Sequence, residues 1–382
     1  MDDVAARAPA ARWATIAAFF LNGTVFGVWA TQIPVIKDHL DLSPGVVGLA
    51  LLCLAAGALT AMIGTGALLS RVGSAPAVRV TALLFCLLLP LPALMPDVVT
   101  LCAILFLFGA AGGTMDVAMN AHGALVERHL GRPIMSSLHG MWSLGGLFGA
   151  GAGGLLLQVL PPVAQCGLIA GALLALFLAV QSRLLPSSAD SSAEPSGLAL
   201  PSRGTLLLGL LTFLAFMSEG AILDWSAIYL REDLGGAATV AGLGFAVFSG
   251  AMAAGRFCGD RLRQRFGGVT LVRTGAMLAF AGLALALLGG GPAVAVVGFG
   301  LTGLGLSNVV PVLFSAAGSG DERSAASSIA AVATLGYAGV LTGPALLGFV
   351  AEASTVGFSF TLVAALALVI ALTSSRAVPR RA

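Results

Sequence analysis

A succession of long apolar segments, separated by short polar ones, is the feature that most constrains this chain. Each segment approaches or exceeds the ~20 apolar residues that a helix needs to cross a bilayer. Cutting the sequence at charges, prolines and polar clusters gives twelve segments, near 13–36, 45–69, 76–95, 99–125, 134–159, 163–185, 204–230, 239–260, 270–289, 292–314, 325–350 and 355–374. The pattern predicts an all-α integral membrane protein with twelve transmembrane helices.

Composition excludes the soluble classes of protein. Hydrophobic residues make up 58% of the 382 residues and charged residues only 9%, whereas a soluble domain has about 25% charged residues. A net charge of +2 with scattered basic residues gives no sign of a nucleic-acid partner. The five cysteines have neither metal-ligand nor disulfide spacing, and no catalytic triad or nucleotide-binding loop is present. We therefore expect no cofactor, no metal and no enzymatic activity.

Basic residues predict the orientation. With the N-terminus inside, seventeen of the 19 Lys and Arg residues fall on the cytoplasmic side, and only Lys37 and Arg231 fall outside. This places both termini in the cytoplasm and the protein in the inner (plasma) membrane. The first apolar run is too long for a signal peptide and further segments follow, so we expect an uncleaved first helix.

The sequence also contains a predicted linker and an internal repeat. A Ser/Pro/Ala-rich stretch, 186–203, predicts a cytoplasmic linker between two six-helix halves, 1–185 and 204–382. At an offset of 194, Arg71 corresponds to Arg265 and Gly73 to Gly267; further on, we place the offset at 191, which pairs Gly109 with Gly300. Halves with six helices each share one topology and are related by an axis along the membrane normal.

The loop after the second segment, from Gly66 to Gly73, resembles the Gly-x-Leu-x-Asp-Arg-x-Gly signature of the major facilitator superfamily, with Ser70 in place of the acid. A second copy runs from Gly259 to Gly267. The segments 114–120 and 131–143 are similar to the YbjJ-like branch of bacterial permeases. The resemblance implies two pseudo-symmetric halves that rock about a central site, and a monomer.

Three acidic residues lie inside predicted spans, Asp116, Glu219 and Asp224, and the first two are candidates for proton coupling. A carboxyl group in an apolar site can take up a proton near neutral pH, and a group that gains and loses a proton is what coupling requires. The alternative is a neutral carboxyl that holds helices together. Glu219 is our candidate proton carrier, Asp116 the better placed to bind solute, and Asp224, near the outer rim, fits a gate.

Further polar residues are candidates for binding the solute: Asn22, Asn120, His139, Trp142, Asn308 and Tyr337. Asn120 lies one helical turn from Asp116, and Asn308 precedes Pro311, which predicts a helix break with freed carbonyl groups. For Asn22 and His139, structural roles as inter-helical glue or packing residues are equally open. Trp29, near the outer end of the first span, is expected to belong to an aromatic belt.

Both signature loops predict a conformational lock. Arg71 in the first loop, and Asp260, Arg261 and Arg265 in the second, occupy equivalent helix ends, where charge pairs would form only when the cytoplasmic side is closed. The alternative is that the arginines only fix the topology. Glycines 145–154 and 336–343 predict faces of small residues for close helix packing.

These observations favour a proton-coupled secondary transporter for a small polar solute. Arg256 is placed about one turn from the end of its span, so no basic residue is expected at the centre of any span; an anionic solute would need one. We therefore expect a neutral or cationic solute. The alternatives are a proton/drug antiporter, which the absence of a Gly-Pro pair in the fifth span disfavours, and a non-transporting membrane sensor.

Overall fold

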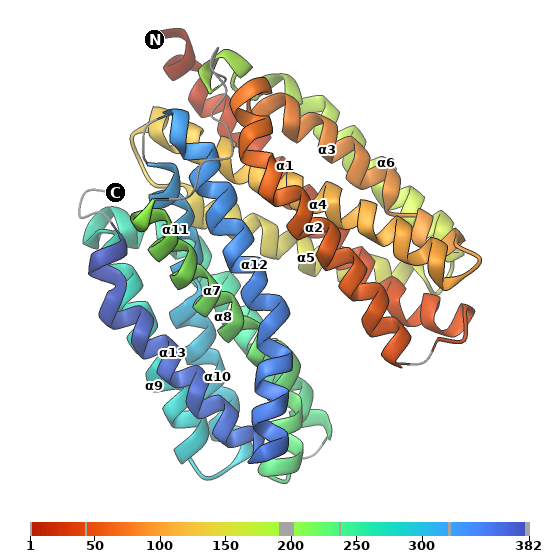
Figure 1. Cartoon of the computed structure of the whole chain (residues 1–382), viewed down its shortest axis with the longest axis vertical. Coiled ribbons are helices and arrows are strands. Elements are labelled where there is room, and N and C mark those ends of the chain that lie inside the picture. Colours follow the sequence, from red (N-terminus) through yellow and green to blue (C-terminus); the bar gives the residue numbers. More distant parts are fainter. Residues whose placement is uncertain (1, 43, 191–201, 237, 320–321, 379–382) are drawn as a thin grey trace. The chain divides into compact units, whose positions relative to one another are not determined.

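The computed structural model describes residues 2–42, 44–190, 202–236, 238–319 and 322–378, which are almost entirely helical (Figure 1). The α-helices are α1 (Asp2–His39), α2 (Pro44–Val72), α3 (Ser74–Leu88), α4 (Val98–Leu130), α5 (Met135–Leu156), α6 (Pro162–Val180), α7 (Arg203–Ile228), α8 (Ala238–Phe266), α9 (Gly268–Leu288), α10 (Pro292–Leu306), α11 (Val309–Gly318), α12 (Glu322–Ala353) and α13 (Val356–Ala377). Short 3₁₀ turns η1 (Leu91–Leu94), η2 (Gln181–Arg183) and η3 (Ser187–Ala189), and a π-turn η4 (Tyr229–Asp233), extend or join them.

Local sequence signals set the helix boundaries. The carboxylate of Asp97 accepts a hydrogen bond from the Thr100 N–H at the start of α4, and this bond lowers the pKa of Asp97. Gly131, with φ 62°, ends the same helix in the left-handed conformation. Pro162 and Pro292 are the first residues of α6 and α10, where the missing N–H costs no hydrogen bond.

The described helices form two compact units. Unit 1 comprises residues 1–132, 141–200 and 320–330, and unit 2 comprises residues 133–140, 201–319 and 331–382. In unit 1, α4 packs against α1, α2 and α3, and α1 packs against α6. In unit 2, α9 packs against α10 and α13, and α8 packs against α10. The first residues of α5 therefore belong to unit 2, and the first residues of α12 to unit 1.

The internal repeat is confirmed. Helices α2 and α8 each have 29 residues, and both their first and their last residues correspond at the offset that pairs Arg71 with Arg265. Each is followed by a glycine with positive φ, Gly73 at 81° and Gly267 at 79°, so both turns need a residue without a side chain. The two halves thus share one fold, that of twelve transmembrane helices in two pseudo-symmetric sets of six, with α10 and α11 forming one span.

Our expected change of offset in the fourth span is wrong. Helices α4 and α10 still begin at the same offset as α2 and α8, since Val98 corresponds to Pro292. Gly109 lies against the carbonyl of Leu54, and Gly303, its counterpart at that unchanged offset, lies against the carbonyl of Phe248. Gly109 therefore corresponds to Gly303, not to Gly300. At both sites a Cβ atom would collide with the backbone of the neighbouring helix, which is why close packing requires glycine there.

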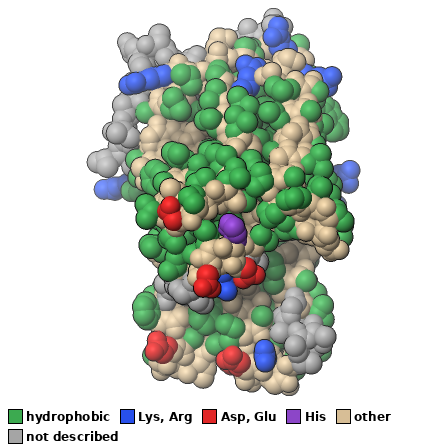
Figure 2. All heavy atoms as spheres, turned by 90° about the vertical axis from the view of Figure 1, so that its right-hand side faces the viewer, with side chains coloured by type: hydrophobic (Ala, Val, Ile, Leu, Met, Phe, Trp, Pro, Cys, Tyr) green, Lys and Arg blue, Asp and Glu red, His purple; other side chains and the backbone are tan. Residues whose placement is uncertain are grey.

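Among the described residues, ten helical segments are long and apolar enough to cross a membrane. Hydrophobic side chains are spread over much of the upper and middle part of the face shown in Figure 2. Large apolar side chains such as Leu288, Val99 and Phe349 are 72–85% exposed. In water such a surface would promote association; in a bilayer it is the surface that faces lipid.

Part of the predicted linker is ordered. Residues 187–189 form η3, and the Asp190 carboxylate accepts hydrogen bonds from the Ser74 N–H at 3.0 and 3.2 Å, at the start of α3. Residues 191–201 lie outside the described part of the chain.

Candidate proton and solute sites

A buried ion pair joins α7 and α8 in unit 2. Arg256 Nη2 lies 3.8 Å from Glu219 Oε2, and the two side chains are 5% and 19% exposed. The other carboxylate oxygen of Glu219, Oε1, is buried and has no hydrogen-bond partner among the described residues. Glu219 thus combines an electrostatic partner with an oxygen that can still accept a hydrogen bond or a proton.

This pair corrects our expectation for Arg256. We placed Arg256 about one turn from the end of its span, but it is almost wholly buried and lies beside Glu219. The sequence does not reveal this contact, because the two residues lie far apart in the chain and on different helices. We expected a neutral or cationic solute because no basic residue was expected at the centre of a span, and the buried Arg256 removes that reason.

A backbone carbonyl group at the break between α10 and α11 accepts a hydrogen bond from Arg256. Pro311 has no N–H to bond the carbonyl four residues earlier, so the helix breaks at Ser307 and Asn308, as we predicted. The freed carbonyl of Ser307 accepts a hydrogen bond from Arg256 Nε at 3.3 Å. The Asn308 amide donates to the carbonyl of Gly255 at 3.0 Å and to Ser307 Oγ at 2.9 Å. The proline therefore provides one acceptor that holds Arg256 in place.

Two other candidates in unit 2 contact aromatic rings. The ring of His139, at the start of α5, lies 5.8 Å from that of Phe314 in α11, and its Nδ1 is 3.0 Å from the carbonyl of Met135. The ring of Tyr337 in α12 packs edge-on against Phe216 in α7 at 5.7 Å. Both residues lie on helices of the unit that holds the Glu219–Arg256 pair.

In unit 1, α1 and α5 are joined by a polar contact. Trp142 Nε1 donates a hydrogen bond to Asn22 Oδ1 at 2.8 Å. The amide nitrogen of Asn22 is buried and has no partner among the described residues. Around this contact, Gly23 lies against the carbonyl of Trp142 and Gly145 against that of Phe20, so the predicted small-residue face of α5 packs closely on α1. The unsatisfied amide is a donor available to a ligand.

A second polar pair lies on α4 of unit 1, which packs against α1. Asn120 Nδ2 donates to the carbonyl of Asp116 at 2.9 Å and approaches its Oδ1 at 3.4 Å, as the one-turn spacing predicts. Asp116 Oδ2 and Asn120 Oδ1 are buried and have no partners in the part of the chain that the structure describes. The three candidate residues Asn22, Asp116 and Asn120 thus carry one free donor and two free acceptors between them.

Asp260, at the end of α8, binds the start of α5 within unit 2. Its two carboxylate oxygens accept hydrogen bonds from the backbone N–H groups of Ser136 and Ser137, each at 2.9 Å. The first N–H groups of a helix lack partners inside the helix and carry a partial positive charge, so an acid is favourable there. We singled out Asp260, but we expected charge pairs rather than these backbone partners.

The equivalent contact in unit 1 has no acid. Gly66 is the counterpart of Asp260 at the offset that relates α2 to α8, and a Cβ atom on it would lie 2.8 Å from the Cα of Ser327 near the start of α12. In unit 2, the carboxylate of Asp260 contacts the start of α5. In unit 1, Gly66 has no side chain, and this allows α2 to lie close to the start of α12.

The remaining gate candidates make few contacts. Arg71, Arg261 and Asp224 are exposed and form no ion pair or hydrogen bond with other described residues. Arg265 lies over the ring of the adjacent Phe266 at 5.2 Å. Trp29 is only 6% exposed and packs on Phe108 at 5.7 Å, so our placement of Trp29 in an aromatic belt is wrong.

Two polar contacts escaped the sequence analysis. His122 in α4 binds Ser74 Oγ at 2.8 Å and accepts a hydrogen bond from the Leu185 N–H at 3.3 Å. Gln32 in α1 donates to Gln165 in α6 at 2.6 Å. A glutamine within the apolar segment 163–185 was the available signal, because such a side chain needs a polar partner in a membrane.

Comparison with known proteins identifies the family. Residues 15–344 match the family model described as Major Facilitator Superfamily. An uncharacterized MFS-type transporter of Yersinia pestis is 38% identical over 95% of this chain and 94% of its own length. Membrane protein MosC of Rhizobium meliloti is 34% identical over 93% of this chain and 87% of its own length.

Solved structures share the fold. The transporter FucP in its outward conformation aligns with a TM-score of 0.77 at 16% identity, covering 96% of this chain and 98% of FucP. The proton:xylose symporter XylE aligns with a TM-score of 0.74 at 12% identity, covering 98% of this chain and 96% of XylE. At these identities the likeness concerns the fold alone.

Proposed function

The chain belongs to the major facilitator superfamily of membrane transporters, and we propose that it moves a small polar solute together with protons by alternating access. The buried Glu219–Arg256 pair is the observation that carries this proposal. A structural ion pair alone would be an expensive way to join two helices in a membrane, because burying both charges costs several kcal/mol per ion.

In the proposed mechanism Glu219 is the proton carrier. While it is ionised, Arg256 offsets its charge, and its free oxygen Oε1 can accept a proton. Protonation would remove the attraction to Arg256, so that the pair exists in two states. A carrier needs such a group, whose charge changes with the side of the membrane to which it is exposed.

We assign solute binding to the polar atoms of unit 1. Asn22 Nδ2 can donate a hydrogen bond, and Asp116 Oδ2 and Asn120 Oδ1 can accept one. This set suits a solute that carries hydroxyl groups, which both donate and accept, or an ammonium group, which can donate to the two acceptors. The proposal agrees with the activities named for two proteins of the same fold, a fucose:proton symporter and a proton:xylose symporter.

The proposal includes the topology expected from the sequence. The protein acts as a monomer in the plasma membrane with both termini in the cytoplasm, and the halves 1–185 and 204–382 are the bodies that move. The contact of Asp260 with the start of α5 is part of the closed cytoplasmic gate and must break when that gate opens.

Purified protein in proteoliposomes that enclose a pH-sensitive dye tests the function. Sugars, polyols, amino sugars, amino acids and lipophilic cations are added one at a time, and solute-driven proton flux is recorded against protein-free liposomes. Proton flux with a hydroxyl- or amine-bearing solute supports the proposal. A response to lipophilic cations alone would instead favour a drug antiporter, and no proton flux with a solute that is itself transported would overturn the coupling.

A further inference from the structure

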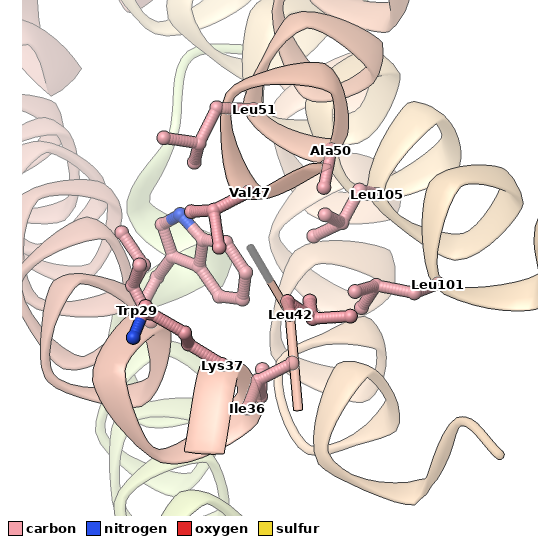
Figure 3. Close-up of a pocket in the computed structure, with 10 residues that line it drawn as sticks. Trp29, Ile36, Lys37, Leu42, Val47, Ala50, Leu51, Leu101 and Leu105 are labelled. Atoms are coloured by element: carbon pink, nitrogen blue, oxygen red, sulfur yellow. The ribbon is translucent and has the colours of Figure 1, made fainter. Parts of the chain in front are cut away.

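An apolar hollow opens in unit 1 where α1, α2 and α4 meet (Figure 3). Trp29, Ile33 and Ile36 line it from α1, and Ala50 and Leu51 from α2. Its deep side is formed by Leu101 and Leu105 of α4, each 1% exposed, whereas Leu51 at the rim is 37% exposed. The hollow therefore leads from a lipid-facing surface toward the core of the unit.

Among the described residues, Lys37 is the only cationic one that lines this hollow, and it is the only lysine in the sequence. It lies in the last turn of α1, two helical turns after Trp29, and its side chain is 43% exposed. Its one ion-pair contact among the described residues is a loose one, with Asp38 at 4.0 Å. Because α1 has 38 residues, it is about 57 Å long and must extend beyond a hydrocarbon core of about 30 Å.

We propose that this hollow binds one glycerophospholipid of the surrounding bilayer, with a few methylene groups of an acyl chain in the hollow between α1, α2 and α4 and the phosphate on Lys37. This site is separate from the polar atoms assigned to solute binding, and the inference does not depend on the proposed transport function.

The chemistry of the walls selects this occupant. A polar solute would find one cation, the indole N–H of Trp29 and otherwise hydrocarbon, with no side-chain acceptor for its own donors. Ordered water is unfavourable for the same reason, since a buried water makes about three hydrogen bonds. A phospholipid fits both the apolar walls and the lysine, because its acyl chain buries apolar surface and its phosphate lies against the ammonium group of Lys37 near the interface. In a membrane it is also the molecule in contact with Leu51.

The single lysine makes the site directly measurable. An amine-reactive ester labels Lys37 and the terminal amine of the purified chain, and the terminal amine serves as the internal reference. Labelling is followed by peptide mass spectrometry for protein in detergent, with and without added palmitoyl-oleoyl-phosphatidylglycerol. Phospholipid is expected to slow Lys37 labelling several-fold relative to the reference. Soluble glycerol phosphate is expected to give no protection, because it lacks the chain.

A pocket-filling variant separates specific binding from general lipid coating. Ala50→Phe places a ring in the hollow, whereas Leu49→Phe, at a neighbouring position 52% exposed and outside the lining, is the matched control. Protection should be lost in Ala50→Phe and retained in Leu49→Phe. As a measurement that does not depend on Ala50→Phe folding, native mass spectrometry should find less retained phospholipid on Lys37→Gln than on wild type. Equal labelling with and without phospholipid, protection by glycerol phosphate, protection that persists in a folded Ala50→Phe protein, or undiminished lipid retention by Lys37→Gln would each overturn the proposal.

Discussion

Arg256 Nη2 lies 3.8 Å from Glu219 Oε2, and the same guanidinium donates through Nε to the backbone carbonyl that Pro311 leaves free. The distance between the two charges is longer than that of a charge-assisted hydrogen bond, about 2.7–2.9 Å. The attraction is therefore electrostatic rather than a tight bidentate contact. Glu219 can lose this partner without the helix break that positions Arg256 having to change.

Removing the charge of Arg256 alone should lower the stability of the protein more than removing the charges of both Arg256 and Glu219. Arg256→Gln leaves the Glu219 carboxylate buried without its counter-charge, and breaking a buried pair in this way costs about 3–5 kcal/mol. We expect a clear fall in the melting temperature of the purified protein, with most of the loss recovered in the double variant Arg256→Gln/Glu219→Gln. The exposed Arg273→Gln serves as the control and should melt like wild type. Equal melting of all four proteins would show that the pair is not energetically coupled.

Asp260→Asn should loosen the start of α5. The variant keeps one acceptor oxygen but loses the charge and one of the two hydrogen bonds from Ser136 and Ser137. If the free energy of local opening at the start of α5 falls by about 1.5 kcal/mol, its backbone amide hydrogens should exchange about tenfold faster. Hydrogen–deuterium exchange of residues 133–140 measures this effect, with residues 101–108 in α4 as the internal reference. Unchanged exchange would mean that Asp260 is not what holds this helix end.

Gly66→Ala tests the corresponding contact in unit 1. The added methyl group would lie 2.8 Å from the Cα of Ser327, so α12 must shift, at a cost of about 1–3 kcal/mol. Gly64→Ala is the matched control, because nothing lies within 4 Å of its Cβ position. We expect faster hydrogen–deuterium exchange of residues 325–330 in Gly66→Ala only. The same exchange in both variants would argue against close packing at Gly66.

Asp116→Asn should weaken solute binding at a pH at which the Asp116 carboxyl is ionised. The substitution keeps the shape of the side chain but removes the charge that makes Oδ2 a strong acceptor, a loss of about 1.5–3 kcal/mol. Isothermal titration with a solute identified by the transport screen measures the change in Kd. Thr114→Val, at a nearby half-buried position of the same helix, should bind the solute as wild type does. Wild-type affinity in Asp116→Asn would remove Asp116 from the solute site.

The positions of the helices could be predicted because they depend on residues that are close together in the sequence. Apolar runs of membrane-spanning length gave the spans, Pro311 gave the break between α10 and α11, and the spacing of Asp116 and Asn120 gave their contact. The repeat was also visible, although the sequence match at Gly300 misled us. Only the contact of Gly303 with the Phe248 carbonyl shows which glycine is equivalent to Gly109.

Contacts between distant segments could not be predicted in the same way. Nothing local to Arg256 indicates that it lies beside Glu219, because the depth of a long basic side chain depends on which helices pack around it. The backbone N–H groups that bind Asp260 carry no sequence signal of their own, since every residue except proline has one. The burial of Trp29 likewise depends on Phe108, a residue of another helix.

The most direct test of the account is the effect of Glu219→Gln on pH-driven transport in proteoliposomes. Glutamine resembles the protonated acid but cannot release a proton, so the variant should bind the solute and exchange it across the membrane while failing to accumulate it in response to a pH gradient. Counterflow of labelled solute and pH-driven uptake are measured on the same preparation, with wild type as the reference. Full accumulation by Glu219→Gln would contradict the assignment of Glu219 as the proton carrier.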